Sequence, residues 1–306
     1  MIRFPLVVVT LVVLLTFFCS EKASAQEVFD WDGEPLKDVQ LEVVRFRGWI
    51  PPGDEPIRGT LILIPGRHGD GRGLAMNADW QRFADETRFA LMGCQFAQGE
   101  PGLYQTDKTG EVSKAIDEAL EKFAELSGKE VLGKGPLLFW GSSAGSNVSE
   151  RYCAVNPDRV VAFGSSKGTR GPGADLPRGK DDIPMFFAVG SKDKAEWVES
   201  AIENIEAGVK KKAPWVLALH PTEGHSVGAS LDAIRPFLKA AIELRLPTSA
   251  TSSKLQKVST RDGWLGDPET YDIAPTSSFK GKRSKAIWLP NEDSALAWQT
   301  YLRKTN

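Results

Sequence analysis

Residues 141–145, with the sequence Gly-Ser-Ser-Ala-Gly, have the types and spacing of a serine nucleophile held in a tight turn. They follow an apolar run at 136–140 that is typical of a buried strand, and they precede a stretch at 146–155 that can form a helix. A strand, a Gly-x-Ser-x-Gly turn and a helix make up a nucleophile elbow, which exposes the serine hydroxyl at the carboxyl end of the strand. Ser143 is therefore the predicted nucleophile for acyl transfer. A motif this short also arises by chance, so the interpretation depends on partner residues elsewhere.

A serine hydroxyl becomes a good nucleophile only when a base takes its proton, and the base is usually histidine. The chain has three histidines. His225 lies in a loop after the apolar run 215–219, at the sheet edge where the elbow is expected. His220 ends that run and is expected to be held by the sheet, whereas His68 follows another strand-like run at the same edge. We therefore predict His225 as the base.

The base needs a carboxylate that orients it. Asp193 comes just after the apolar run 183–189 and two positions before the next expected helix, which places it at the same edge of the sheet. Asp181 and Asp182 precede this run and would lie at the opposite edge, and Glu196 is a reserve candidate. Serine, aspartate and histidine, in this order and each after a strand, predict a catalytic triad.

Negative charge that develops on the substrate oxygen needs hydrogen-bond donors already in place. The backbone amide of Ala144, directly after the serine, is predicted to be one of them. The second is expected from the glycine-rich loop 65–71, with the amide of Arg67 as first choice and that of His68 next. This chemistry requires no metal ion and no organic cofactor.

The elements that would position these residues alternate between strand-like and helix-like patterns. The stretch 39–49 suggests one or two edge strands, and the continuous apolar run 60–64 is typical of a buried parallel strand. Further strands are expected at 89–96, 137–140, 159–163, 183–189 and 215–219. Helices are expected at 74–88, 112–123, 146–155, 197–205 and 231–242. This alternation predicts an α/β fold, with a mostly parallel central sheet and helices on both faces.

Two segments depart from the alternation. No helical pattern precedes the strand at 183–189; residues 168–180 are instead polar and rich in glycine, so neither a large cap domain nor a hydrophobic lid is expected. A polar linker begins at residue 248. We therefore predict an α/β domain at 26–247 and a short C-terminal extension at 248–306, which is too small to fold easily alone and is expected to pack on the domain.

Residues 1–25 have the features of a secretory signal peptide. Arg3 precedes a short apolar run at 4–18, and Ala-Ser-Ala occupies positions 23–25. The apolar run is shorter than the roughly 20 residues that a membrane span needs. Cleavage near Ala25 is expected, which predicts a secreted or periplasmic protein without a stable membrane anchor; an uncleaved anchor is the alternative.

Charge and cysteine content narrow the possible functions. The formal net charge of −2 becomes −3 when Arg3, Glu21 and Lys22 leave with the signal peptide, a balance that argues against a nucleic-acid partner. Cys94 and Cys153 remain after processing. Both lie among apolar residues, where cysteine behaves as a small hydrophobic side chain, so two unpaired buried thiols are favoured over a disulfide.

Residues 39–247 resemble the α/β-hydrolase superfamily. Within it, they look like compact secreted serine esterases of the polyhydroxybutyrate depolymerase, feruloyl esterase and dienelactone-hydrolase-like groups. The resemblance is carried by segments 61–66, 141–145, 190–193 and 224–225. It implies Ser143 as nucleophile, Asp193 as acid and His225 as base. Pro65-Gly66 stands where many relatives have a histidine–glycine pair, which leaves the second oxyanion donor open.

These features predict a serine hydrolase that cleaves carboxylic esters through an acyl-enzyme. Cationic residues in the polar loop suggest a hydrophilic or acidic substrate, either a small molecule or an ester linked to a polysaccharide. His68, Tyr104 and Arg170 are the predicted substrate-rim residues. Two alternatives are a serine peptidase of the prolyl-oligopeptidase type and a non-catalytic binding protein on a hydrolase scaffold.

Overall fold

The computed structural model describes most of the 306-residue chain, namely residues 27–98, 107, 110–168, 182–246 and 254–304. The predicted signal peptide at 1–25 lies outside the described residues. So do two of the predicted rim residues, Tyr104 and Arg170, and most of the polar loop at 168–180.

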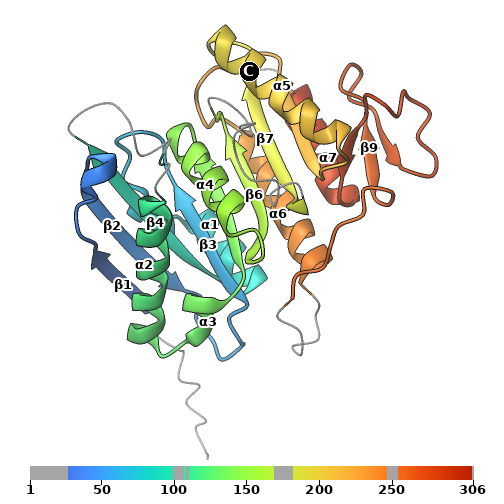
Figure 1. The fold of residues 1–306 in the computed structure, drawn as a ribbon. Helices are drawn as coiled ribbons and strands as arrows, with labels where there is room; N and C mark the ends of the chain where they lie inside the picture. Colours follow the sequence, from blue (N-terminus) through green and yellow to red (C-terminus); the bar gives the residue numbers. More distant parts are fainter. Residues whose placement is uncertain (1–26, 99–106, 108–109, 169–181, 247–253, 305–306) are drawn as a thin grey trace, which may run out of the picture.

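A sheet of eight strands forms the centre of the molecule (Figure 1). In chain order the strands are β1 (Glu27–Asp32), β2 (Leu41–Ile50), β3 (Gly59–Ile64), β4 (Phe89–Gln98), β5 (Leu137–Ser142), β6 (Val160–Ser166), β7 (Met185–Gly190) and β8 (Trp215–His220). Their order across the sheet is β1-β2-β4-β3-β5-β6-β7-β8. Strand β2 is antiparallel to both of its neighbours, and all other neighbouring strands are parallel. The predicted mostly parallel sheet is confirmed.

Helices cover both faces of this sheet (Figure 1). They are α1 (Ala78–Thr87), α2 (Glu111–Ser127), α3 (Glu130–Lys134), α4 (Ala144–Val155), α5 (Ala195–Lys210), α6 (Ser230–Arg245) and α7 (Glu292–Arg303). One apolar core lies between the sheet and α2, α4 and α5, and a second lies between the sheet and α1, α6 and α7. Strands β3, β6 and β7 are buried at every position, because both of their faces are covered. None of the helices in the described part of the chain is both long and apolar enough to cross a bilayer.

Some elements differ from those expected. The stretch 39–49 yields one strand, β2, and it lies one place in from the edge because the unpredicted strand β1 pairs outside it. The helix expected at 74–88 is divided: a 3-10 turn ends at Met76, and α1 starts after Asn77, whose side chain accepts the amides of Asp79 and Trp80. Pro236 lies inside α6, which runs without interruption from Ser230 to Arg245.

The C-terminal extension forms a small structure of its own on the flank of the domain. Strands β9 (Trp264–Gly266), β10 (Ile273–Pro275) and β11 (Ile287–Leu289) form an antiparallel sheet in the order β10-β9-β11, and α7 follows. Trp298 of α7 is fully buried, and its indole N–H donates to the carbonyl of Leu217 in β8 at 3.0 Å. The extension, drawn in orange to red in Figure 1, thus packs on the side of the molecule away from β1.

Cys94 and Cys153 both lie in the core on the same face of the sheet. Cys94 is on β4, Cys153 is on α4, and neither forms a disulfide. Burial raises the pKa of both thiols well above the ordinary value, which keeps them protonated and unreactive. The prediction of two unpaired buried thiols is confirmed.

Candidate active site

The elbow is a sharp turn around Ser143, with β5 ending just before it and α4 beginning just after it. Ser143 has φ 50° and ψ −118°, a backbone conformation that residues other than glycine rarely adopt. Such a conformation costs roughly 1–3 kcal/mol. A Cβ atom on Gly145 would lie 2.2 Å from the carbonyl oxygen of Ile64, and one on Gly141 would lie 2.5 Å from that of Gly145. The two flanking glycines are therefore required by the close approach of backbone to backbone.

The structure brings the three residues of the predicted triad into hydrogen-bond contact. Ser143 Oγ lies 2.8 Å from His225 Nε2, and His225 Nδ1 lies 2.5 Å from Asp193 Oδ2. Asp193 also accepts the backbone amide of Lys194 through Oδ1 at 2.8 Å. Because a carboxylate can only accept, Nδ1 of the imidazole must donate to it, which leaves Nε2 free to accept the serine proton. The side chain of Asp193 is 7% exposed and that of His225 34% exposed, so the acid is shielded and the base is open to a substrate.

The rejected candidates for base and acid lie in other environments. His220 is completely buried at the end of β8, and its Nδ1 accepts the backbone amide of Glu223 at 3.2 Å. His68 is exposed in the loop after β3 with a positive φ of 61°. Asp182 precedes β7, at the opposite end of that strand from Asp193. None of these three side chains takes part in the hydrogen bonds that join Ser143, His225 and Asp193.

Two backbone segments border the candidate nucleophile. Ala144 is the first residue of α4, and the first amides of a helix have no partner within it, so they are available to a negatively charged oxygen. On the other side, the loop after β3 approaches closely: a Cβ on Gly66 would lie 3.4 Å from the Cβ of Ser143. Arg67 follows in this loop and is exposed, and a turn closes as Gly69 N–H donates to the Gly66 carbonyl at 2.9 Å.

An aromatic residue that the sequence analysis did not assign to the site lies beside the imidazole. The periodicity of 197–205 gives Trp197 a core position, but its half-buried ring packs against His225 with 4.9 Å between ring centroids. Lys194 places its ammonium 4.3 Å from the centre of the same indole, a cation–π contact. Trp197 is in the first turn of α5, just after the predicted acid Asp193. This closeness in sequence was the signal that could have assigned Trp197 to the site.

A buried ion pair lies close to the loop that carries His225. Lys167 directly follows β6, its side chain is 1% exposed, and its Nζ donates to Glu223 Oε2 at 2.5 Å and to the Tyr301 hydroxyl at 2.7 Å. Burial by itself would raise the pKa of Glu223, but the hydrogen bonds from Lys167 and Tyr301 outweigh it and lower that pKa. Burial lowers the pKa of the Lys167 ammonium, and the hydrogen bond to Glu223 opposes this shift.

This ion pair predicts a pH-dependent contribution to stability. Because folding lowers the pKa of Glu223 below 4.5, its contribution is complete above that pH and is lost as the pH falls through the folded-state pKa. We expect Glu223→Gln to lower the free energy of unfolding by about 3 kcal/mol at pH 7, because it leaves Lys167 buried without its counter-charge. The deficit relative to the wild type should shrink at pH 3, as measured by urea unfolding at both pH values.

The matched control for this prediction is Glu269→Gln. The Glu269 carboxylate pairs with Lys285 at 2.9 Å on the exposed surface, where such pairs contribute less than about 1 kcal/mol. A stability deficit of Glu223→Gln that is equally large at pH 7 and pH 3 would contradict the assignment of a charged Glu223.

No protein-family model matches the sequence, and the search of curated proteins finds no match. Among solved structures, a ferulic acid esterase is similar at 13% sequence identity and a TM-score of 0.53, over 72% of this chain and 100% of the esterase. The chain has the α/β-hydrolase fold.

Other solved structures with weaker superpositions are also similar. The fluorophosphonate-binding serine hydrolase FphF of Staphylococcus aureus is similar at 11% sequence identity and a TM-score of 0.49, over 71% of this chain and 99% of the FphF chain. An S-formylglutathione hydrolase from Agrobacterium tumefaciens is similar at 17% sequence identity and a TM-score of 0.49, over 71% of this chain and 94% of the hydrolase chain.

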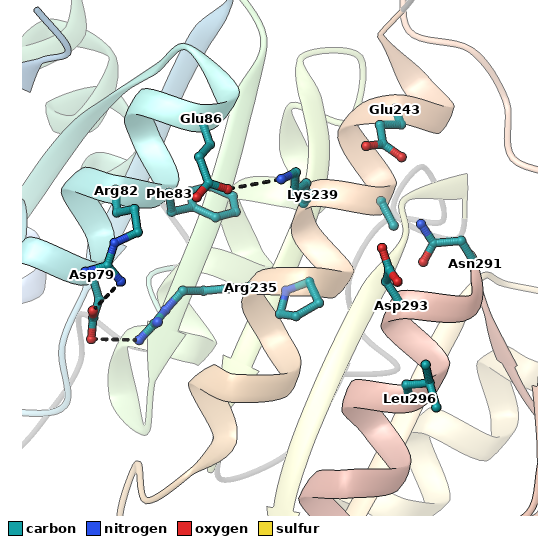
Figure 2. A pocket seen from close by; sticks show the side chains of 12 residues that line it. Asp79, Arg82, Phe83, Glu86, Arg235, Lys239, Glu243, Asn291, Asp293 and Leu296 are labelled. Carbon is teal, nitrogen blue, oxygen red and sulfur yellow. Dashed lines mark hydrogen bonds and ion pairs between the residues drawn. The ribbon is translucent and has the colours of Figure 1, made fainter.

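The α/β-hydrolase fold of this chain also carries a pocket between α1, α6 and α7, which none of the three triad residues lines (Figure 2). Several of its charged side chains pair with one another. Asp79 contacts Arg82 at 3.1 Å and Arg235 at 3.7 Å, and Lys239 contacts Glu86 at 3.0 Å. We therefore locate the candidate active site of this α/β-hydrolase fold at Ser143 rather than at this pocket.

Proposed function

We propose that the protein is a serine hydrolase that cleaves carboxylic esters through a covalent acyl-enzyme. The observation that carries the proposal is the continuous series of hydrogen bonds from Ser143 through His225 to Asp193. A strained serine at the carboxyl end of a buried strand, directly before the first residue of a helix, supports it. A structural serine in a turn would need neither the imidazole nor the carboxylate behind it.

The geometry supports the following sequence of steps. Ser143 Oγ attacks the ester carbonyl while its proton passes to His225 Nε2, and Asp193 stabilises the resulting imidazolium. The carbonyl oxygen becomes an oxyanion, for which we propose the amides of Ala144 and Arg67 as donors. The C–O bond to the alcohol then breaks, and His225 returns its proton to the leaving oxygen. Water next gives a proton to His225 and attacks the acyl carbon, which releases the acid and restores the serine hydroxyl.

The surroundings of His225 favour a hydrophilic or acidic ester as substrate. Lys194 and Trp197 present a cation and an aromatic face beside the imidazole. Arg67 and His68 are exposed in the loop after β3, which approaches Ser143 at Gly66. We propose a small-molecule or polysaccharide-linked ester, and we retain export to the periplasm or exterior as part of the proposal, on the strength of the predicted signal peptide.

A fluorophosphonate probe tests the enzyme class directly, because it reacts with activated serine hydroxyls. We expect one adduct per folded molecule, located on Ser143 by peptide mass spectrometry and abolished by prior unfolding. An absence of labelling in the folded protein would instead favour a binding protein on a hydrolase scaffold.

A panel of chromogenic substrates then separates ester from peptide hydrolysis. We expect turnover of short p-nitrophenyl esters and none of aminoacyl anilides. Turnover of the anilides alone would identify a peptidase and overturn the proposed specificity, while leaving the triad intact.

A further inference from the structure

The C-terminal extension reaches the neighbourhood of the candidate base through one buried side chain. Tyr301 lies on α7, is 1% exposed, and donates its hydroxyl to Glu223 Oε2 at 2.7 Å. Glu223 is only two positions before His225 in the loop between β8 and α6. We propose that Tyr301 is a positioning residue: with Lys167 it holds Glu223, and through Glu223 it orients the loop that carries the base. This inference rests on the proposed hydrolase function.

Glu223 is held by both its side chain and its backbone. Its Oε2 accepts from Lys167 and Tyr301, and its Oε1 accepts the backbone amide of Ala229 at 3.1 Å. The backbone amide of Glu223 donates to Nδ1 of the buried His220 at 3.2 Å. The side chain thus ties the end of the loop at Ala229 to its start, and the base lies between these two fixed points.

The same residue also fixes the loop that carries the acid. The carbonyl of Glu223 accepts the backbone amide of Lys192, the neighbour of Asp193, at 2.9 Å. A Cβ on Gly190 would lie 2.5 Å from that carbonyl oxygen, so the two loops are in close contact. Any displacement of Glu223 would therefore alter the distance between acid and base, not only the position of one of them.

The hydroxyl of Tyr301 can be removed without emptying the space that the ring fills. The ring packs against His220 with 4.8 Å between centroids, and phenylalanine preserves this contact. What is lost is one of the two donors on Glu223 Oε2 and one acceptor of the Lys167 ammonium, so the carboxylate is held only by Lys167 and by the backbone amide of Ala229. Small misplacements of catalytic groups have large effects on rate, which makes a conservative substitution informative.

The test compares Tyr301→Phe with Tyr271→Phe in the full-length protein. Tyr271 belongs to the same extension, and no hydrogen bond of its hydroxyl is found among the described residues; its ring packs on Trp298. We expect Tyr301→Phe to lower kcat for a p-nitrophenyl ester roughly tenfold with KM almost unchanged, and to slow fluorophosphonate labelling by a similar factor. Tyr271→Phe should match the wild type in both measurements.

A double-mutant cycle with Glu223→Gln separates positioning from general destabilisation. If Tyr301 acts through Glu223, the loss of kcat in the double variant should be far smaller than the product of the two single losses. A Tyr301→Phe variant that melts at a lower temperature but keeps wild-type kcat and labelling rate would overturn the positioning role alone. A wild-type protein that neither labels nor turns over esters would instead overturn the proposed function, and this inference with it.

Discussion

Ser143→Ala is expected to lower kcat/KM for a p-nitrophenyl ester about 10⁶-fold, the scale seen when a triad enzyme loses its nucleophile. The substitution removes only the hydroxyl group, and without its oxygen the acyl-enzyme cannot form. Alanine occupies the same strained backbone position at little additional cost, and the fold should persist. Initial-rate kinetics on the purified variant, together with the loss of the fluorophosphonate adduct, measure the effect.

The neighbouring Ser142→Ala provides the matched control. Ser142 is the last residue of β5, and the hydrogen bonds to His225 and Asp193 involve the hydroxyl of Ser143, not that of Ser142. We expect less than a tenfold change in kcat/KM, in line with a substitution outside the catalytic groups. Equal losses in the two variants would show that the wrong serine has been assigned as nucleophile.

Asp193→Asn is expected to lower kcat roughly 10⁴-fold while the variant remains folded. The carboxylate can only accept, which keeps the proton of His225 on Nδ1 and leaves Nε2 as the acceptor for Ser143. An amide can present an N–H to Nδ1, which favours the tautomer with its proton on Nε2, where it cannot act as the base. Pre-steady-state kinetics should show slow acylation. Thermal unfolding should show a melting temperature within a few degrees of the wild type.

Glu196→Gln is the control for this second prediction. Glu196 is the reserve acid in chain order, and it is exposed in the first turn of α5. Its replacement should leave kcat within a few-fold of the wild type. A large loss in Glu196→Gln and a small one in Asp193→Asn would transfer the role of the acid to Glu196.

The sequence could indicate which three residues form the candidate triad, because the signal depends on local order along the chain. Ser143, Asp193 and His225 each follow an apolar run, and the carboxyl ends of parallel strands share one edge of a sheet. The elbow glycines carry a further local signal, since the turn around the serine admits no larger residue. Once the sheet was expected to be parallel, these three residues were expected at one edge of it, whereas their contact depends on the order of the strands.

Other features depend on packing between distant segments and left little trace in the sequence. Residues 27–32 form β1 with alternating half-buried and exposed positions, a pattern too short to stand out. Strands β9 to β11 have three residues each, below the length at which periodicity is informative. Trp197 has the helical spacing of a core residue, and only the three-dimensional position of the first turn of α5 places it beside the base. Lys167 and Tyr301 could not be paired from sequence, because no local rule relates them.

The hydrogen bonds among Lys167, Glu223 and Tyr301 join positions that are 56, 78 and 134 residues apart. Closing chain segments of this length costs entropy, and contacts between distant positions are what slow the folding of a domain. We therefore expect the working alignment of His225 to appear only with global folding, after the strands and helices that carry the triad have formed. A chain in which these strands and helices have formed, but in which Lys167, Glu223 and Tyr301 are not yet in contact, should be inert toward esters. Recovery of hydrolysis after refolding should therefore lag behind recovery of secondary structure.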